Sequence, residues 1–363
     1  MSQSILQSLL NTSWTLHRLS PLHHGKEFQS LIGNKVALRT YATRLRDHLT
    51  GNFFAEAQAG LGGTGVVVDD SLSRTGSLKN CLWETLSAPS SLGAGQLSGQ
   101  TLPGELSGIL VVLEYENITY KAALIAAPEG RRTSARRKQS TQLPLLLTRF
   151  PNPLRQTFIS FLSANFDTYC STLRLPSNFL CAELNAFIDV LMSGTSEQSI
   201  DSYRMLEDII KEVQLTLSFS PSVAPLLKSL NINIPRGSFA MFARESNTSM
   251  GSEHGSSSHP KQTILTGLST YLEKHLAIDL NLAGPSTSQG SEKQHARLTK
   301  VACGSFVLGG EGKMKLVASS AATSSGDSAG DAHSIKDHLL LRAHEALLRA
   351  VLRRAASEDE ENT

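Results

Sequence analysis

The chain has 363 residues, of which 40% are hydrophobic and 18% are charged, and its formal net charge is +2. This length fits about two domains of ~150 residues each, or one domain that carries long loops. The hydrophobic content is sufficient for a folded core, while the small net charge excludes a global basic field that would bind DNA without specificity.

The N-terminal stretch NTSWTLHRLSPLHHG, residues 11–25, predicts the first strand. Apolar and polar residues alternate over Ser13–Leu19, the pattern of a half-buried strand, and Pro21 ends it. In this pattern Trp14 lies on the apolar face and His17 on the opposite face. We interpret the stretch as an edge or hairpin strand followed by an exposed turn.

A helix is expected from Lys35, because apolar residues recur there at steps of three and four positions. It should have about four turns, since Gly51 stands where a glycine commonly follows a helix. Residues 53–70 predict two short strands around a glycine turn, and another strand is expected at residues 76–87.

The strongest β signal lies in the stretch from Gly108 to Ala126. Two runs rich in strand-forming residues, Gly108–Tyr115 and Ile118–Ala126, flank Glu116 and Asn117. Such a two-residue connection predicts a tight β-hairpin.

The rest of the chain mixes helices and strands. Helical spacing predicts helices at 152–166, 176–192 and 263–277, a short helix near Pro225–Leu230 and a final helix after Ser334. Strands are expected at 212–220 and as a pair at Arg297–Leu308 and Gly312–Val317. Because strands recur as hairpins and helices come in clumps, the sequence predicts an α+β fold with a mainly antiparallel sheet, packed helices and long disordered inserts.

These signals also suggest boundaries along the chain. An N-terminal α+β half is expected at 1–127, a basic loop at 128–142, and a C-terminal α+β half at 143–318 on the same or a continuous sheet. A flexible linker at 319–333, a C-terminal helix at 334–356 and an acidic tail at 357–363 complete the prediction.

Several residues suggest chemistry, but none has the pattern that the chemistry needs. His17, His23 and His24 lack further ligands at zinc spacing, so polar packing is favoured over a metal site. The glycines of the G-x-G-x-x-G pattern precede a β-rich run rather than a helix, which favours a tight turn over a dinucleotide site. Adjacent aspartates face opposite sides of a strand and do not pair as acid and base. The glycines are Gly60, Gly62 and Gly65, and the aspartates are Asp69 and Asp70.

Catalysis, cofactors and membranes find no support in the sequence. No G-x-S-x-G elbow occurs, and Cys81, Cys170, Cys181 and Cys303 lie far apart without ligand or nucleophile context. We therefore expect no catalytic residue, no cofactor and no metal. No apolar run approaches the ~18 residues of a membrane-spanning helix, and no signal peptide is recognised at residues 1–10, so the cytosol or nucleus is expected.

The basic loop gives a firmer signal for binding. Its cations are long, flexible donors suited to phosphate oxygens, although a solvated insert explains them about as well. They are Arg131, Arg132, Arg136, Arg137 and Lys138.

The N-terminal residues also resemble a known family. NTSWTLHRLSPLHHG, the helix LRTYATRLRDHLTG and the turn AQAGLGG resemble the N-terminal region of fungal CENP-L-like subunits of the inner kinetochore, over roughly the first 65 residues. The resemblance implies a non-enzymatic member of the constitutive centromere-associated network with a curved, mainly antiparallel sheet. It also implies a location in the nucleus, at the kinetochore of the chromosome's centromere.

Within that family, the resemblance implies pairing with a CENP-N-like subunit through the later β region. The heterodimer would link the centromeric nucleosome and a CENP-C-like protein to the outer assembly for chromosome segregation in cell division. A late β-rich run could add its backbone to a partner's sheet, or be an interior strand of the chain's own sheet. Its candidate partner-binding residues are Leu298, Val301, Phe306, Val307 and Leu308.

Two other functions remain open from the sequence. A nucleic-acid-binding module would act through the basic loop and contact centromeric DNA or a nucleosome directly. An enzyme would use the glycine turn to hold a nucleotide.

Overall fold

The computed structural model describes residues 4–60, 75–87, 106–126, 139–193, 200–219, 226–238, 264–276, 296–319 and 330–357. They belong to two compact units. The first comprises Met1–Leu9, Trp14–Leu173 and Val351–Thr363, and the second comprises Leu10–Ser13 and Arg174–Ala350. The predicted halves at 1–127 and 143–318 do not coincide with this division, and as folding units they stay a prediction.

The sheet of the first unit has the order β3-β4-β5-β7-β1, with β8 paired to β1, and all of these pairs are antiparallel. Two-residue strands β2 and β6 pair separately. The bounds are β1 Ser13–Leu19, β2 Leu22–His23, β3 Leu78–Ser87, β4 Ser107–Tyr115, β5 Thr119–Ile125, β6 Ser140–Thr141, β7 Leu145–Arg149 and β8 Cys170–Thr172.

The predicted hairpin is the clearest agreement between sequence and structure. β4 and β5 pair antiparallel up to Glu114 and Thr119, and Tyr115 N–H donates to the carbonyl of Ile118 at 3.0 Å. β4 is buried almost throughout, because it is an interior strand whose two faces are both covered.

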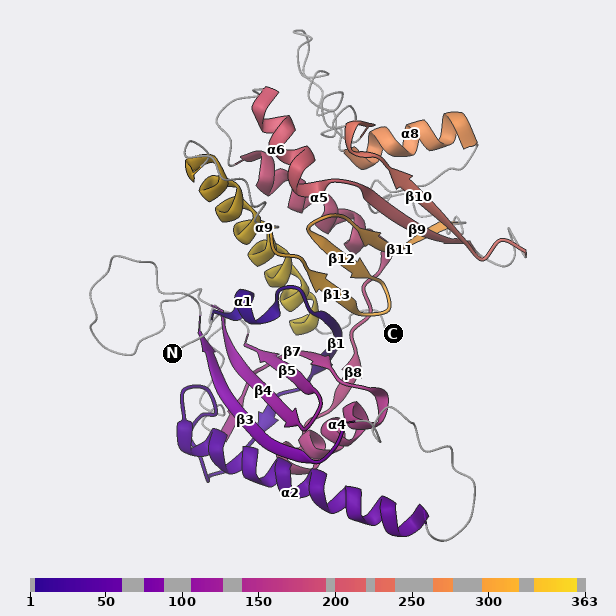
Figure 1. Cartoon of the computed structure of the whole chain (residues 1–363). Coiled ribbons are helices and arrows are strands. Elements are labelled where there is room, and N and C mark those ends of the chain that lie inside the picture. The colour runs from indigo at the N-terminus through magenta and orange to yellow at the C-terminus, as the bar shows by residue number, and fades with distance from the viewer. Residues whose placement is uncertain are drawn as a thin grey trace. The chain divides into compact units, whose positions relative to one another are not determined.

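The helix α2, Lys35–Gly60, packs along the face of β3, as Figure 1 shows. It begins at Asn34, whose Oδ1 accepts hydrogen bonds from Val36 N (3.2 Å) and Ala37 N (3.1 Å), the pattern of an N-cap. The prediction that it ends at Gly51 is wrong, and so is the strand expected from residue 53, because α2 continues to Gly60. Gly51 does not adopt the positive φ of a helix-ending glycine.

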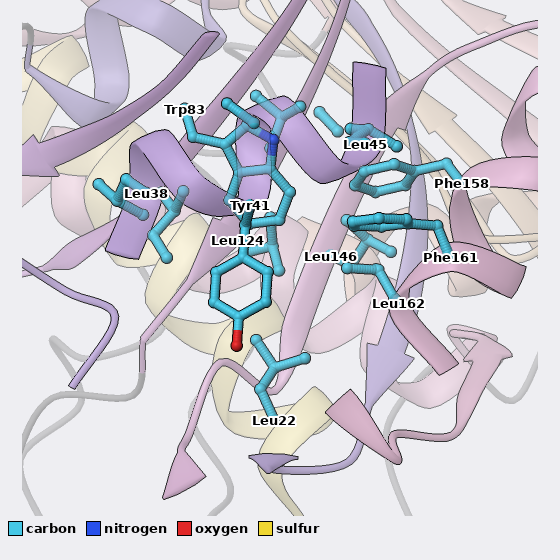
Figure 2. Packing of buried hydrophobic residues seen from close by; sticks show 14 of the residues in the cluster. Leu22, Leu38, Tyr41, Leu45, Trp83, Leu124, Leu146, Phe158, Phe161 and Leu162 are labelled. Carbon is cyan, nitrogen blue, oxygen red and sulfur yellow. The ribbon is translucent and has the colours of Figure 1, made fainter. Parts of the chain in front are cut away.

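The core of the first unit lies between this sheet, α2 and α4, Asn152–Phe166. The Tyr41 ring of α2 lies 4.4 Å from the ring of Phe166, and Trp83 of β3 packs edge-on to Phe161 at 6.5 Å. Figure 2 shows Tyr41 and Trp83 beside Phe158 and Phe161 of α4. The helix predicted at 152–166 is confirmed.

The first strand is not an edge strand, so that part of the prediction is wrong. β1 pairs with β7 through Thr15–Arg18 and with β8 through His17–Leu19. Its apolar and polar faces are both largely buried, His17 included. The alternation correctly gave a strand, but strands distant in sequence cover it on both sides.

The sheet of the second unit has the order β10-β9-β11-β12-β13, again antiparallel throughout. Beyond β13, Leu10 forms an isolated parallel bridge with Leu316. The bounds are β9 Val213–Phe219, β10 Ser229–Ile234, β11 Ala296–Ala302, β12 Phe306–Gly309 and β13 Lys313–Leu316.

Two predictions in this unit are wrong. The strand expected over Arg297–Leu308 folds back on itself at Cys303–Ser305 and becomes β11 and β12. The short helix near Pro225–Leu230 is not found among its described residues, where Leu226–Lys228 lead directly into β10. At Arg297–Leu308 the turn at Cys303–Ser305 divides the predicted strand into two. At Leu226–Leu230 pairing with β9 decides that the chain enters a strand and not a helix.

Helices α5, Ser177–Ser193, and α6, Ile200–Ile210, belong to the second unit, and α5 packs on β11 (Figure 1). α8 covers Ile264–Leu276, and α9 covers Gly330–Ala356, four residues longer at its start than the helix predicted at 334–356. α1, Ile5–Leu9, precedes β1. Across the described part of the chain, no helix combines the length and apolar character needed to cross a membrane.

Together these elements confirm the α+β class and the mainly antiparallel sheet. Each sheet is open. The residues predicted as inserts fall mostly outside the described residues.

Candidate protein and nucleic-acid interfaces

The histidines of residues 11–25 lie in different surroundings. His17 Nε2 lies 3.2 Å from Thr148 Oγ1 inside the sheet, and His24 Nε2 lies 3.1 Å from Thr141 Oγ1, while His23 is exposed. Among the residues that the structure places, no three His, Cys, Asp or Glu side chains gather as metal ligands. Each buried ring is therefore explained by packing and a threonine hydroxyl.

Burial sets the protonation state of these rings. It lowers the pKa of His17 to about 4, with a further contribution from the Arg155 cation, and it also lowers the pKa of His24. Both are neutral near pH 7. A neutral ring in a closed hydrogen bond is a structural group, not a poised acid or base.

Burial also sets the protonation state of the four cysteines. All are free thiols. Burial raises the pKa of Cys81 and Cys170 to about 12 and that of Cys181 and Cys303 to about 11. Since the thiolate is the nucleophile and the metal ligand, these side chains are suited to packing.

Several predicted sites fall outside the described residues. This applies to Gly62, Gly65, Asp69 and Asp70, while Gly60 is the last residue of α2. It also applies to the whole cationic part of the basic loop, namely Arg131, Arg132, Arg136, Arg137 and Lys138. The loop begins after β5 and returns at β6, so both of its ends are in the first unit.

The candidate partner-binding residues lie in the interior of the second unit's sheet. β11 pairs with β9 on one side and β12 on the other, so it has no free edge. Leu298, Val301, Phe306 and Leu308 are buried, and Val307 is half-buried on the opposite face. This matches the alternative that the run is an interior strand of the chain's own sheet. Partner binding through these side chains stays a prediction.

The free edge of this sheet is β10. Among the described residues, β10 pairs only with β9. Phe219 N–H donates to the carbonyl of Lys228, so hydrogen-bonded and non-hydrogen-bonded pairs alternate from there. The backbone groups of Ser229, Asn231 and Asn233 therefore point away from β9. The partner strand shows the same alternation. Thr216, which pairs with Asn231, directs its carbonyl away from β10, where it accepts a hydrogen bond from Thr299 Oγ1 of β11 (3.0 Å).

The two faces of this sheet differ sharply. The inner face is apolar and includes Leu215, Leu217, Val301 and Leu308, all of them buried. The outer face, which we define by the register of the five strands, has no carboxylate. Its members are Ser229, Asn231, Asn233, Gln214, Thr216, Ser218, Arg297, Lys300, Ala302, Val307, Gly309, Lys313 and Lys315.

The cations of the outer face form one patch. Lys300 and Lys313 share a row across β11, β12 and β13, because each pairs with Gly309. Lys315 lies about 7 Å further along β13, and Arg297 lies on β11 beyond the irregularity at Thr299. Such spacing suits a row of phosphates better than a single small anion.

A comparison with protein-family models matches residues 8–356 of the chain to CENP-L, Centromere protein L. The match covers both units and nearly the whole chain. The chain belongs to the CENP-L family. A comparison with curated proteins gave no match.

As a member of the CENP-L family, the protein is a centromere and kinetochore subunit that acts in the nucleus in chromosome segregation. CENP-L is a structural family of the kinetochore, and its partners belong to the inner kinetochore complex. The family resemblance seen in residues 11–65 is thus confirmed and extends over the later β region as well. A fungal origin stays a prediction.

Two alternating runs in the sequence correspond to the two surfaces of this CENP-L protein. The alternation in SLNINI, residues 229–234, gives a short uncharged strand, and the alternation in KMKL, residues 313–316, places two lysines on one face. Neither pattern shows by itself which strand is at the edge.

Proposed function

We propose that this CENP-L protein pairs with a CENP-N-like subunit and that the partner adds a strand to β10. The heterodimer would link centromeric chromatin and a CENP-C-like protein to the rest of the kinetochore. The observation that carries the proposal is that β10 pairs only with β9 among the described residues, while backbone donors and acceptors of Ser229, Asn231 and Asn233 face away from β9.

A comparison of two edge strands, β10 and β3, supports this choice. Proteins protect edge strands with charges, prolines or bulges. β10 has no charged residue and no proline over Ser229–Ile234, whereas β3, at the edge of the first unit's sheet, carries Lys79 and Glu84 and has an irregular register near Leu78. β10 is also preceded by exposed Leu226 and Leu227, which could extend the contact with apolar surface.

The test uses a proline that removes one outward donor. Asn231→Pro deletes an N–H that is not used by β9, so the β9–β10 hairpin should persist while pairing with the CENP-N-like subunit weakens at least about tenfold. Asn231→Ala is the matched control, because it loses the same side-chain contact with Thr216 Oγ1 (2.8 Å) but keeps the backbone N–H.

Co-expression followed by size-exclusion chromatography and titration calorimetry would give the two affinities. Binding by both variants with the affinity of the wild type would refute the β10 interface. If neither variant binds and the wild type does, the Asn231 side chain rather than the strand edge is responsible.

A second candidate function is contact with duplex DNA through the outer face. The specific observation is the patch of Arg297, Lys300, Lys313 and Lys315 on a face without carboxylates. Phosphate contacts by such cations release counterions, so the affinity should fall steeply with salt. The basic loop belongs to the first unit and is a separate candidate for phosphate contact.

Replacing these four cations with Gln should lower duplex affinity and reduce the slope of log K against log salt by about 3 to 4. The control replaces four exposed cations of the first unit, Lys26, Lys35, Arg39 and Arg46, and should leave the slope nearly unchanged. Replacing the five cations of the basic loop should leave pairing with the CENP-N-like subunit intact. A slope equal to the wild type in the outer-face variant excludes this second function.

A further inference from the structure

The end of α9 is held by an arginine from β1, and an exposed serine lies at the same place. Arg18 Nη2 donates to the carbonyls of Arg354 (2.9 Å) and Ser357 (2.6 Å). Ser357 N–H closes the last turn on the carbonyl of Arg353 (2.9 Å), and Ser357 Oγ donates to the carbonyl of Arg354 (2.9 Å). All of these residues belong to the first unit.

Three guanidinium groups therefore belong to the neighbourhood of Ser357. Arg354 and Arg353 precede it by three and four residues, the spacing at which side chains meet on a helix. Among the described residues, no carboxylate forms an ion pair with Arg353 or Arg354, and the Nε of Arg354 is buried without a hydrogen-bond partner. An anion on Ser357 would find charged donors already in place.

The sequence after Ser357 is acidic: Glu358, Asp359, Glu360 and Glu361 follow it directly. From this juxtaposition we propose that Ser357 is a phosphorylation site for a kinase that recognises acidic residues C-terminal to the serine, and that Arg18, Arg353 and Arg354 hold the phosphate.

The helix decides between two kinase classes. Arginines at three and four positions before a serine also suit a basophilic kinase, but that enzyme binds its substrate extended and would have to unwind the last turns of α9. The carbonyl of Arg354 is held by Arg18 and the helix is continuous to Ala356. An acidophilic kinase recognises residues after Ser357, so its recognition depends on no residue of α9 before Ser357.

The chemistry needs only ATP as a co-reactant. A bond forms between Ser357 Oγ and the γ-phosphorus, the bond to the oxygen bridging the β- and γ-phosphorus breaks, ADP leaves, and the hydroxyl proton passes to the kinase's base. The product places about two negative charges at a helix C-terminus, where the dipole disfavours them. Charge-assisted bonds to the arginines offset this cost.

The first test treats the full chain with ATP and an acidophilic serine kinase of the casein kinase 2 type, and maps the phosphate by mass spectrometry. We expect modification at Ser357, its loss in Ser357→Ala, and at least a tenfold slower reaction when Glu358, Asp359 and Glu360 become Gln, Asn and Gln. Arg353→Gln with Arg354→Gln should change the rate less than about twofold. Phosphate only at other serines, or loss of reaction in the arginine variant, overturns the site or its kinase class.

The second test measures how the phosphate is held. Its second pKa, ordinarily about 6, should be at least about 0.5 lower in the wild type than in the Arg353→Gln, Arg354→Gln variant, as followed by phosphorus NMR. Arg342→Gln is the control, an exposed arginine of α9 distant from Ser357 along the helix. Identical titrations in all three proteins would overturn the proposed arginine contacts even if Ser357 is modified.

Discussion

Protonation of His17 should destabilise the first unit as the pH falls below neutrality. The ring is almost fully buried in β1, its Nε2 lies 3.2 Å from Thr148 Oγ1, and the Arg155 cation is near. Burial and this cation lower its pKa from 6.5 to about 4. The unfolded chain therefore binds the proton more tightly than the folded chain.

The magnitude follows from this pKa difference. Stability is fully present above pH 6.5, the value for the unfolded chain, and is lost progressively as the pH falls to about 4. At 1.36 kcal/mol for each pKa unit, the loss is about 3 kcal/mol at most. After screening by nearby solvent we expect about 2 kcal/mol between pH 7 and pH 4.5.

Urea unfolding followed by tryptophan fluorescence measures this loss. Trp14 and Trp83 are both in the first unit and report on it. His17→Gln keeps a polar group for Thr148 but cannot titrate. Between pH 7 and pH 4.5 the variant should therefore lose about 2 kcal/mol less stability than the wild type loses. His23→Gln, at an exposed position, is the control and should follow the wild type. Parallel pH dependences for His17→Gln and the wild type would refute the reasoning.

Three further predictions concern single side chains. Gly51→Ala should stabilise the first unit by about 0.5–1 kcal/mol in urea unfolding, because Gly51 lies inside α2 with open space around it, and a loss of stability would contradict this placement. Asn34→Ala should cost about 1 kcal/mol through loss of the α2 N-cap, and Asn34→Asp should restore most of it in the same assay. Phe306→Ala should lower the stability of the second unit by about 3–5 kcal/mol, because it leaves a cavity among buried side chains. Val307 is half-buried on the outer face, so Val307→Ala should cost under about 1 kcal/mol. Hydrogen exchange of β11–β13 measures both effects. Equal effects at these two positions would contradict the assignment of the two faces.

The histidines and cysteines show how far residue chemistry alone could exclude functions. Missing ligand spacing argued against a metal site at residues 11–25, and the structure explains His17 and His24 by hydrogen bonds to threonines distant in sequence. The sequence could not show that His17 is buried, because one strand's alternation describes only its own two faces. β7 and β8 supply its surroundings.

The candidate surfaces depended even more on pairing. SLNINI and KMKL are visible in the sequence as alternating strands, yet an edge or a charged face is a property of neighbouring strands. The β-rich run around Val301 suggests a strand that could join a partner's sheet, but β9 and β12 occupy its two edges. In the described part of the chain, β10 pairs only with β9, and it lies two strands from β11 in the sheet.

By itself the sequence determined the class of fold, the tight hairpin of β4 and β5, the helix α4 and the family, because each depends on a local period, a turn or a motif. The tertiary structure alone decided that α2 passes through Gly51, that Arg297–Leu308 folds into two strands, and which edge stays open. The physical reason is that the local preferences at these points are worth about 1 kcal/mol, while the burial and hydrogen bonding gained by pairing with distant strands and helices are worth several.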